Sequence, residues 1–334
     1  MPKIEVYKDT LYSFMGREMS LEELDELLPT AKAELDDYDE DEGIIKIELN
    51  DTNRPDLWST AGLGRQLRVF LSGQTPDYSF CSTEADSLDS SDRLVEVDPG
   101  LCNIRPFVAA FAVTGKPIDE SALKDIIQTQ EKLCWNFGQK RKSIAMGVYR
   151  SDLISYPVKF LAADPDSTRF VPLQMEDELS LREIIEKHPK GHDFGHIVAD
   201  FAKFPFLTDS EGEVLSFPPI INSSRLGAVQ IGDENLFIEM TGTDLRSILL
   251  AISIVACDMT DYGFTILPVK TVYPYDTEFG REIVSPYYFQ QGCTAEIGDI
   301  NRMLGDDFTL QEAAGYARKM GLSIEVGNSS LTVV

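Results

Sequence analysis

Two stretches of the sequence place apolar strand residues next to hydroxyl, amide and carboxyl side chains. They are SFPPIINSS, which begins at Ser216, and LFIEMTGTD, which begins at Leu236. Apolar segments that carry a few polar groups at their ends are typical of a pocket for a small polar ligand. The candidate binding residues are Ser216, Asn222, Ser223, Glu239, Thr241, Thr243 and Asp244, with Gly242 allowing close backbone approach.

The same residues also have a purely structural interpretation. Thr243 or Asp244 is suited to cap the helix that follows, because a short oxygen-bearing side chain accepts a hydrogen bond from the first turn. Pro218 and Pro219 would then fix a turn. The residues alone leave both interpretations open.

Three histidines, His188, His192 and His196, are spaced four residues apart. On a continuous helix this spacing would align them as metal ligands. One proline and two glycines lie among them and predict that no helix continues through this segment. We therefore expect a polar loop here and no metal site.

Signatures of other reactions are weak or missing. AGLGRQL, from Ala61, has two of the three glycines of a dinucleotide-binding loop but lies outside any βαβ unit, which favours the start of a packed helix. The sequence contains no GxxxxGK(S/T), GxSxG or HExxH motif. The basic cluster Lys140, Arg141 and Lys142 fits either phosphate contacts or cations at the end of a helix.

The composition describes an ordinary soluble protein with an acidic surface. The 334 residues are 43% hydrophobic and 26% charged, enough for two or three domains. The formal net charge of -26 argues against a protein that grips nucleic acid by itself. Five cysteines without a CxxC pair, no signal peptide and no membrane-length apolar segment predict a cytoplasmic protein.

A small N-terminal α+β domain is predicted over residues 1–75. Ser20 and Glu23 have the spacing of a capping box before a short amphipathic helix. IIKIELN, from Ile44, alternates as a half-buried strand, and DTNRPDL then predicts a turn. A further helix is expected from Ser59 to Gly73.

Residues 76–95 have little apolar periodicity and are predicted to form a linker. A larger domain is expected over residues 96–274. Strands are predicted at 107–113, 143–149, 157–162, 214–217 and 236–240, and helices at 123–137, after Ser180 and from Asp244 to Met259. This alternation predicts an α+β fold with a mixed sheet covered by helices.

Residues 275–334 predict a partial winged-helix-like domain. Two helices, the second capped by Thr309 and Glu312, precede a hairpin around Gly327 and Asn328. The segment lacks a basic recognition face, which argues against DNA binding. The chain stops just after a strand, so we expect it to be part of a longer protein.

Four segments in order resemble the β subunits of archaeal and eukaryotic phenylalanyl-tRNA synthetases. They are SFMGREMSLEEL, IKIELNDTNRPDLWSTAGLGRQL, FPPIINS and LFIEMTGTDL. The resemblance spans nearly the whole chain. Two residues depart from the family pattern: Trp58 stands where an aliphatic residue is usual, and Glu239 stands where aspartate is more frequent.

The resemblance implies that the larger domain is an editing module, which hydrolyses tyrosine wrongly attached to tRNA(Phe). By similarity, Leu207, Ser216, Glu239 and Thr241 line the amino-acid part of its pocket, and the local pattern adds Asn222 and Asp244. Glu239 or a neighbouring hydroxyl would orient the substrate or the attacking water. Backbone amides near Gly242 would stabilise the oxyanion.

The resemblance also implies partners. The β subunit would join an α subunit in a heterotetramer of two α and two β chains and would bind tRNA(Phe). Phenylalanine, ATP and magnesium would be used by the complete synthetase, with no cofactor in this part. The alternative is a non-catalytic scaffold that holds the α subunit and tRNA.

Overall fold

The chain forms two compact units. The computed structural model describes residues 2–50, 53–81, 90, 92–289 and 291–333. Residues 1–77 and 289–334 make up the first unit, and residues 78–288 make up the second. None of the described helices has the length and apolar composition needed to span a membrane.

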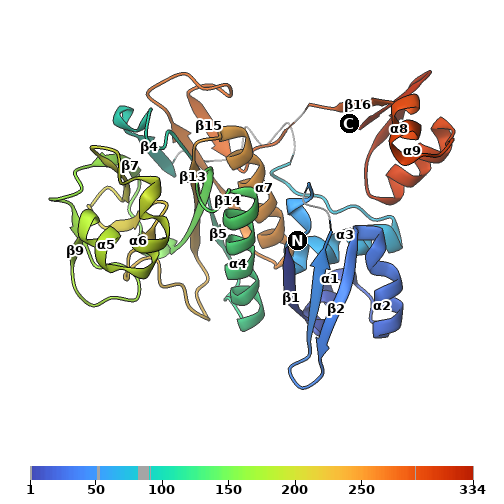
Figure 1. Cartoon of the computed structure of the whole chain (residues 1–334), viewed down its shortest axis with the longest axis horizontal. Helices are drawn as coiled ribbons and strands as arrows, with labels where there is room; N and C mark the ends of the chain where they lie inside the picture. The colour runs from blue at the N-terminus through green and yellow to red at the C-terminus, as the bar shows by residue number, and fades with distance from the viewer. Residues whose placement is uncertain (1, 51–52, 82–89, 91, 290, 334) are drawn as a thin grey trace. The chain divides into compact units, whose positions relative to one another are not determined.

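The first unit begins with a three-stranded antiparallel sheet in the order β1-β3-β2 (Figure 1). Its elements are β1 (Lys3–Tyr7), α1 (Lys8–Met15), α2 (Leu21–Leu27), η1 (Leu28–Ala31), β2 (Ala33–Asp39), β3 (Ile44–Leu49), η2 (Pro55–Leu57) and α3 (Thr60–Ser72). Ile45, Ile47 and Leu49 are buried, which confirms the predicted strand. Residues 51 and 52 of the predicted turn lie outside the described residues.

The helix ends of this region follow the predicted capping residues. The Glu23 amide donates to Ser20 Oγ at 3.1 Å, and the Ser20 amide donates to Glu23 Oε2 at 2.8 Å. Ser59 Oγ accepts from the Gly62 amide at 2.9 Å. Helix α3 ends at Gly73, whose φ of 71° is a left-handed value that glycine adopts at little cost.

The end of the chain adds a second small sheet to the first unit, in the order β16-β18-β17. Its elements are β16 (Cys293–Glu296), α8 (Ile297–Leu304), α9 (Leu310–Lys319), β17 (Ile324–Val326) and β18 (Ser330–Val333). Thr309 and Glu312 form the predicted capping box. Strands β17 and β18 pair antiparallel, which confirms the predicted hairpin.

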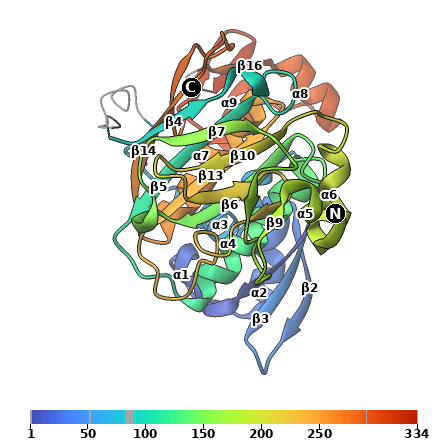
Figure 2. The ribbon, with the colours of Figure 1, turned by 90° about the vertical axis from the view of Figure 1, so that its left-hand side faces the viewer.

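The second unit is built on a ten-stranded mixed sheet, whose strands are seen in Figure 2. The order is β12-β11-β10-β7-β4-β14-β5-β13-β6, and β15 also pairs with β14. The strands are β4 (Leu94–Val97), β5 (Phe107–Thr114), β6 (Ile144–Arg150), β7 (Val158–Ala163), β10 (Phe204–Thr208), β11 (Val214–Phe217), β12 (Ile221–Asn222), β13 (Leu236–Gly242), β14 (Thr265–Val272) and β15 (Glu282–Ser285). Strand β4 runs parallel to β7 and β14, and the other pairs are antiparallel.

Helices cover this sheet, which confirms the predicted α+β class. Helix α7 (Leu245–Asp261) packs across β5, β13 and β14. Helix α4 (Glu120–Lys132) continues into a π-helical turn, η5 (Leu133–Phe137). The shorter 3-10 turns are η4 (Pro99–Leu101) and η6 (Ser151–Leu153).

The second unit extends beyond the predicted limits of 96–274 at both ends, and strand β4 already begins at Leu94, within the predicted linker. Strand β15 lies beyond residue 274 and pairs with β14, so the sheet extends past the predicted end of the larger domain. The predicted linker over 76–95 includes residues 82–89 and 91, which lie outside the described residues.

The two ends of the strand order meet through hydrogen bonds. Strand β6 ends the strand order, and the hydroxyl oxygen of its Tyr149 lies 2.8 Å from Ser216 Oγ on β11. The Asn222 amide nitrogen on β12 donates to the Val148 carbonyl at 3.4 Å. Sheets of this size coil because each strand twists against its neighbour. We call the place where β6 meets β11 and β12 the seam.

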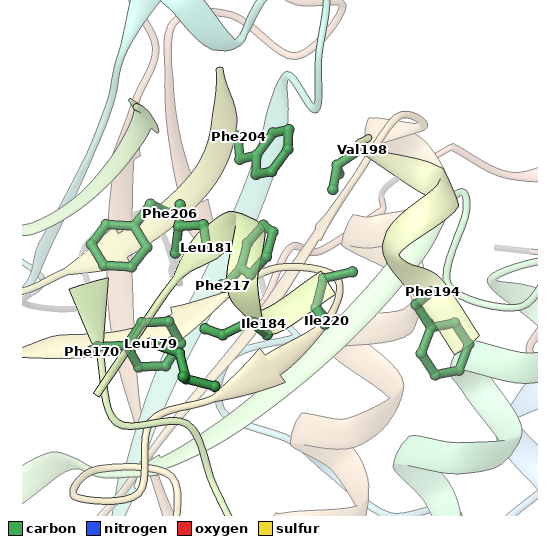
Figure 3. Packing of buried hydrophobic residues seen from close by; sticks show 10 residues of the cluster. All are labelled: Phe170, Leu179, Leu181, Ile184, Phe194, Val198, Phe204, Phe206, Phe217 and Ile220. Carbon is green, nitrogen blue, oxygen red and sulfur yellow. The ribbon is translucent and has the colours of Figure 1, made fainter. Parts of the chain in front are cut away.

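A separate hydrophobic cluster includes residues of β10 and β11 (Figure 3). It involves β8 (Arg169–Phe170), β9 (Leu179–Ser180), α5 (Leu181–Lys187), α6 (Pro189–Phe194) and η7 (Gly195–Ile197). The rings of Phe204 and Phe217 stack with centroids 5.5 Å apart. The predicted capping box of Ser180 and Glu183 is formed at α5. Two members of this cluster, Phe217 and Ile220, also line a cavity beside the seam.

Candidate functional site

A cavity of about 490 Å³ lies beside the seam. Its apolar wall includes Ile126 and Ile127 of α4, and its polar wall includes Ser216, Asn222 and Glu239. This volume is within the range of pockets that bind small organic molecules. A wall that combines apolar side chains with polar and charged ones suits a ligand with an apolar part and hydrogen-bonding groups.

The three predicted polar residues of this wall meet at Tyr149. The tyrosine hydroxyl lies 2.8 Å from Ser216 Oγ, 2.9 Å from Glu239 Oε1 and 3.4 Å from Asn222 Oδ1. Glu239 lies on β13, next to β6, while Ser216 and Asn222 oppose each other on β11 and β12. The seam therefore brings together side chains from opposite ends of the strand order.

Gly147 makes room for this contact. It lies opposite Glu239 in the register of β6 and β13, two residues before Tyr149 and on the same face of the strand. A methyl group at Gly147 would overlap both the Tyr149 hydroxyl and Glu239 Oε1. The glycine allows the tyrosine ring to lean along the strand and reach the carboxylate.

Glu239 is a buried carboxylate with one unused oxygen. The residue is 2% exposed, and its Oε2 accepts no hydrogen bond from the described residues. Burial raises the pKa of the Glu239 carboxyl to about 7, while the hydrogen bond from Tyr149 and the charge of Arg105 act in the opposite direction. The site thus holds an acceptor whose charge changes near neutral pH.

Thr241 is buried and lies outside the cavity wall. Its Oγ1 accepts a hydrogen bond from Arg105 Nε at 2.9 Å, and its carbonyl accepts from Arg105 Nη2 at 2.6 Å. Arg105 also donates to the Lys142 carbonyl at 3.2 Å. The guanidinium, itself 1% exposed, ties the end of β13 to the chain before β6.

Leu207 and Gly242 occupy structural positions near the site. Leu207 is fully buried on β10 and pairs with Ser216 of β11, but it does not line the cavity. Gly242 ends β13, where a Cβ atom would overlap the Ser143 carbonyl. The close approach that this glycine permits is therefore one between neighbouring strands.

Asp244 caps helix α7. Its Oδ1 accepts from the Ser247 amide at 3.3 Å, and its Oδ2 accepts from the Ser247 hydroxyl at 2.7 Å. The amide of Thr243 donates to the Ser143 carbonyl at 3.1 Å. Ser223 Oγ accepts from the Leu226 amide at 3.2 Å. These three candidates lie outside the cavity wall.

One residue of the basic cluster, Arg141, contacts the cavity wall. Arg141 Nη1 donates to the carbonyls of Pro219 and Ile220, each at 3.0 Å. Its guanidinium lies 4.3 Å from the centre of the Phe194 ring. Lys140 lies 5.1 Å from the centre of the Trp135 ring. Arg141 thus links α6 to the turn before β12.

The histidine segment contains a helix, so the predicted loop is wrong there. Proline is tolerated as the first residue of α6, where no amide partner is needed. His188 Nδ1 accepts from the Lys190 amide at 3.0 Å, and Nε2 lies 3.1 Å from the Leu173 carbonyl. Among the described residues, no group of three His, Cys, Asp or Glu side chains is arranged to hold a metal.

The sequence pattern missed Tyr149, Gly147 and Arg105. A glycine inside an apolar strand was one available signal, because such a residue often marks close approach of other groups. Arg105 offered no comparable signal, since its partners lie 37 and 136 residues further along the chain.

Comparisons with known proteins agree on one family. Residues 1–73 match the family described as Phe-tRNA synthetase beta subunit B1 domain. The chain is 47% identical over 325 residues to the phenylalanine–tRNA ligase β subunit of Borreliella burgdorferi (strain ZS7). It is 46% identical over 323 residues to that of Borrelia hermsii (strain HS1 / DAH). Each alignment covers 97% of this chain and 57% of the relative, so the chain spans little more than half of their length.

A solved structure covers the same region. The crystal structure of an N-terminal fragment of the phenylalanyl-tRNA synthetase β subunit from Pyrococcus horikoshii is 35% identical, with a TM-score of 0.89. The match covers 99% of this chain and 93% of that one. The chain therefore belongs to the phenylalanyl-tRNA synthetase β-subunit family and corresponds to its N-terminal region.

Proposed function

We propose that the second unit is an editing module that hydrolyses the ester of tyrosine wrongly attached to tRNA(Phe). The observation that carries the proposal is Glu239, a buried carboxylate in the wall of a ligand-sized cavity, with an oxygen that accepts no hydrogen bond from the described residues. A phenolic hydroxyl is a donor of the right kind for this oxygen.

This arrangement favours tyrosine over phenylalanine. The two amino acids differ by one hydroxyl, and an apolar pocket that admits phenylalanine rejects tyrosine only modestly. An editing site has the opposite task, because it must bind tyrosine and reject phenylalanine. Phenylalanine would leave the buried Glu239 oxygen unmatched, which costs the desolvation of that group, whereas tyrosine would satisfy it.

The hydrolysis needs little further chemistry. An aminoacyl ester is already activated, so a water held beside its carbonyl carbon suffices as the nucleophile. We assign Glu239 to selection and to orienting the substrate or that water. Thr241, held by Arg105, supports the end of β13 from outside the cavity. Stabilisation of the oxyanion by amides near Gly242 would use groups other than the Thr243 amide, which already donates to Ser143.

The wider assignment concerns the whole β subunit. We propose that this chain works with a catalytic α subunit and tRNA(Phe) in a cytoplasmic synthetase that uses ATP and magnesium. The similarity to the Pyrococcus horikoshii fragment over 99% of the chain supports the archaeal and eukaryotic type. The Borreliella and Borrelia relatives support the β-subunit assignment but come from bacteria.

The test compares clearance of Tyr-tRNA(Phe) and Phe-tRNA(Phe) by this chain. We expect tyrosine to be released faster, and Glu239→Ala should reduce the ratio of the two rates about tenfold or more, the effect of losing a hydrogen bond to a charged group. Glu234→Ala, at an exposed glutamate just before β13, is the matched control and should keep the ratio.

Tyrosyl and phenylalanyl esters of adenosine serve as substrates that do not depend on tRNA docking. Background-level loss of both esters and of both charged tRNAs would contradict the proposal and would favour the scaffold alternative.

A further inference from the structure

Tyr149 lies behind the cavity wall, and its hydroxyl contacts three polar residues of that wall. Its side chain is fully buried, and its hydroxyl has Ser216, Glu239 and Asn222 as neighbours within 3.4 Å. Burial and the nearby Glu239 raise the pKa of Tyr149 well above its ordinary value. The phenol therefore stays protonated and has one proton to donate.

The direction of the hydrogen bonds follows from charge. A hydrogen bond to an ionised carboxylate is stronger than one to a hydroxyl or amide oxygen. Tyr149 therefore donates to Glu239 Oε1, at 2.9 Å, and accepts from the Ser216 hydroxyl, at 2.8 Å. The chain of donors runs from Ser216 through Tyr149 to Glu239, and each bond polarises the next.

Building on the editing function proposed above, we infer that Tyr149 is a positioning residue that determines substrate preference. Its hydroxyl donates a hydrogen bond to Glu239 Oε1 and so holds the carboxylate in place. Glu239 Oε2 is then left as the acceptor for a hydroxylated substrate ring. The substrate class is an aminoacyl ester with a phenolic side chain.

The hydroxyl has a role that packing alone does not explain. The Tyr149 ring packs against Phe237, with centroids 6.2 Å apart, and a phenylalanine would keep that contact. It would leave Glu239 Oε1 and the Ser216 hydroxyl without their present partner. The Tyr149→Phe change therefore separates the effect of the hydroxyl from that of the ring.

The charge on Glu239 depends on a small set of groups. The hydrogen bond from Tyr149 on β6 and the positive charge of Arg105, ahead of β5, both lower the Glu239 pKa, against the larger effect of burial. Cys134 on η5 also interacts with Glu239, and burial raises the pKa of its thiol to about 11, so it is neutral. Arg141, Glu131 and Lys190 also line the cavity.

Loss of the Tyr149 hydroxyl should favour the protonated form of Glu239. A neutral acid costs less than a carboxylate when it is left unmatched, so phenylalanine would be penalised less. The preference for tyrosine should then fall near neutral pH and recover partly at higher pH, where the carboxyl ionises again.

The experiment measures two quantities in the wild-type chain and in Tyr149→Phe. The first is the ratio of clearance rates for tyrosyl and phenylalanyl esters of adenosine between pH 6 and 9. The second is the titration of the Glu239 carboxyl by carbon-13 NMR, with its signal assigned by its loss in Glu239→Gln. We expect the ratio to fall about tenfold at pH 7, the size of one hydrogen bond to a charged group, and the titration to move to higher pH.

Two further variants serve as a control and as a second test of the inference. Tyr273→Phe removes another buried hydroxyl of the second unit, which bonds the Val108 backbone outside the cavity, and should change neither quantity. Ser216→Ala keeps Tyr149 but removes the donor that polarises it, and should move the titration in the same direction by less. This second variant tests the inference even where Tyr149→Phe does not fold.

The outcomes separate the two proposals. A wild-type chain without tyrosine preference contradicts the editing function, while the NMR titrations still test the coupling of Tyr149 to Glu239. A wild-type chain that prefers tyrosine, with an unchanged ratio and an unchanged titration in Tyr149→Phe, overturns the inference. If Tyr149→Phe does not fold, an unchanged titration in Ser216→Ala overturns it.

Discussion

Gly147 lies directly opposite Glu239 on the neighbouring antiparallel strand, and the carboxylate uses the space that a glycine leaves. The same space admits the Tyr149 hydroxyl. A position without a side chain, in the middle of a buried strand, therefore shapes the hydrogen bonding of the cavity wall.

The first prediction follows from this space. In Gly147→Ala, the new methyl group would overlap the Tyr149 hydroxyl and Glu239 Oε1, so one of them has to move. Overpacking of this kind typically lowers the free energy of unfolding by about 1–3 kcal/mol. Urea unfolding of the wild-type chain and of Gly147→Ala measures this change in the free energy of unfolding. The matched control is Gly298→Ala in α8, where a Cβ atom would meet no neighbour within 4 Å; equal effects of the two changes would contradict the proposed crowding.

The second prediction concerns stability and pH. The Glu239 pKa of about 7 in the folded chain lies above its ordinary value of 4.5. The folded state therefore holds this proton where the unfolded state has lost it, and this residue's contribution to stability falls as the pH rises from 4.5 to 7. The shift corresponds to about 3 kcal/mol.

Glu239→Gln removes this titration. We expect its stability relative to the wild-type chain to increase between pH 4.5 and 7 and then to level off. Urea unfolding at several pH values gives the difference. A constant difference across that range would show that Glu239 titrates normally.

The third prediction separates the two interpretations of Asp244. As the cap of α7, its removal in Asp244→Ala should lower the free energy of unfolding by about 1 kcal/mol, and Asp244→Asn should lower it less, because asparagine also caps well. The ratio of tyrosyl to phenylalanyl ester clearance should stay the same in both variants. A changed ratio in the folded Asp244→Asn chain would return Asp244 to the substrate site.

Local sequence patterns predicted the elements well, because their causes are local. The capping pairs at Ser20, Ser180 and Thr309 act within four residues, and all three are formed. Continuous apolar runs likewise placed β5, β6 and β13 to within a few residues, since a strand covered on both faces needs apolar side chains throughout.

The composition of the site depended on contacts that local pattern does not encode. Periodicity assigns a residue to a face of a strand but does not say which distant strand will meet it. Tyr149 and Ser216 are 67 residues apart and join only because the two ends of the strand order meet. The same reason explains Thr241, which lies two residues beyond Glu239 on the same face of β13 yet is buried against Arg105.

The last prediction concerns Arg141, which ties the cavity wall to α6. Its guanidinium donates to two consecutive carbonyls, Pro219 and Ile220, and lies over the Phe194 ring. Lysine keeps the charge but has no planar fork and stacks less well on a ring, so Arg141→Lys should loosen the turn before β12. Hydrogen exchange at the amides of Ile220 and Ser223 should become faster, and KM for tyrosyl adenosine should rise more than kcat falls.

Lys140→Gln is the matched control for this change. Lys140 belongs to the same turn and lies over the exposed Trp135 ring instead of the cavity. Both residues have left-handed backbone values, with φ of 56° and 68°, so the two substitutions are made in similar conformations. Lys140→Gln should leave both measurements unchanged. If the two variants behaved alike, the basic cluster would act through its charge, and the hydrogen bonds of Arg141 to the turn would not be the cause.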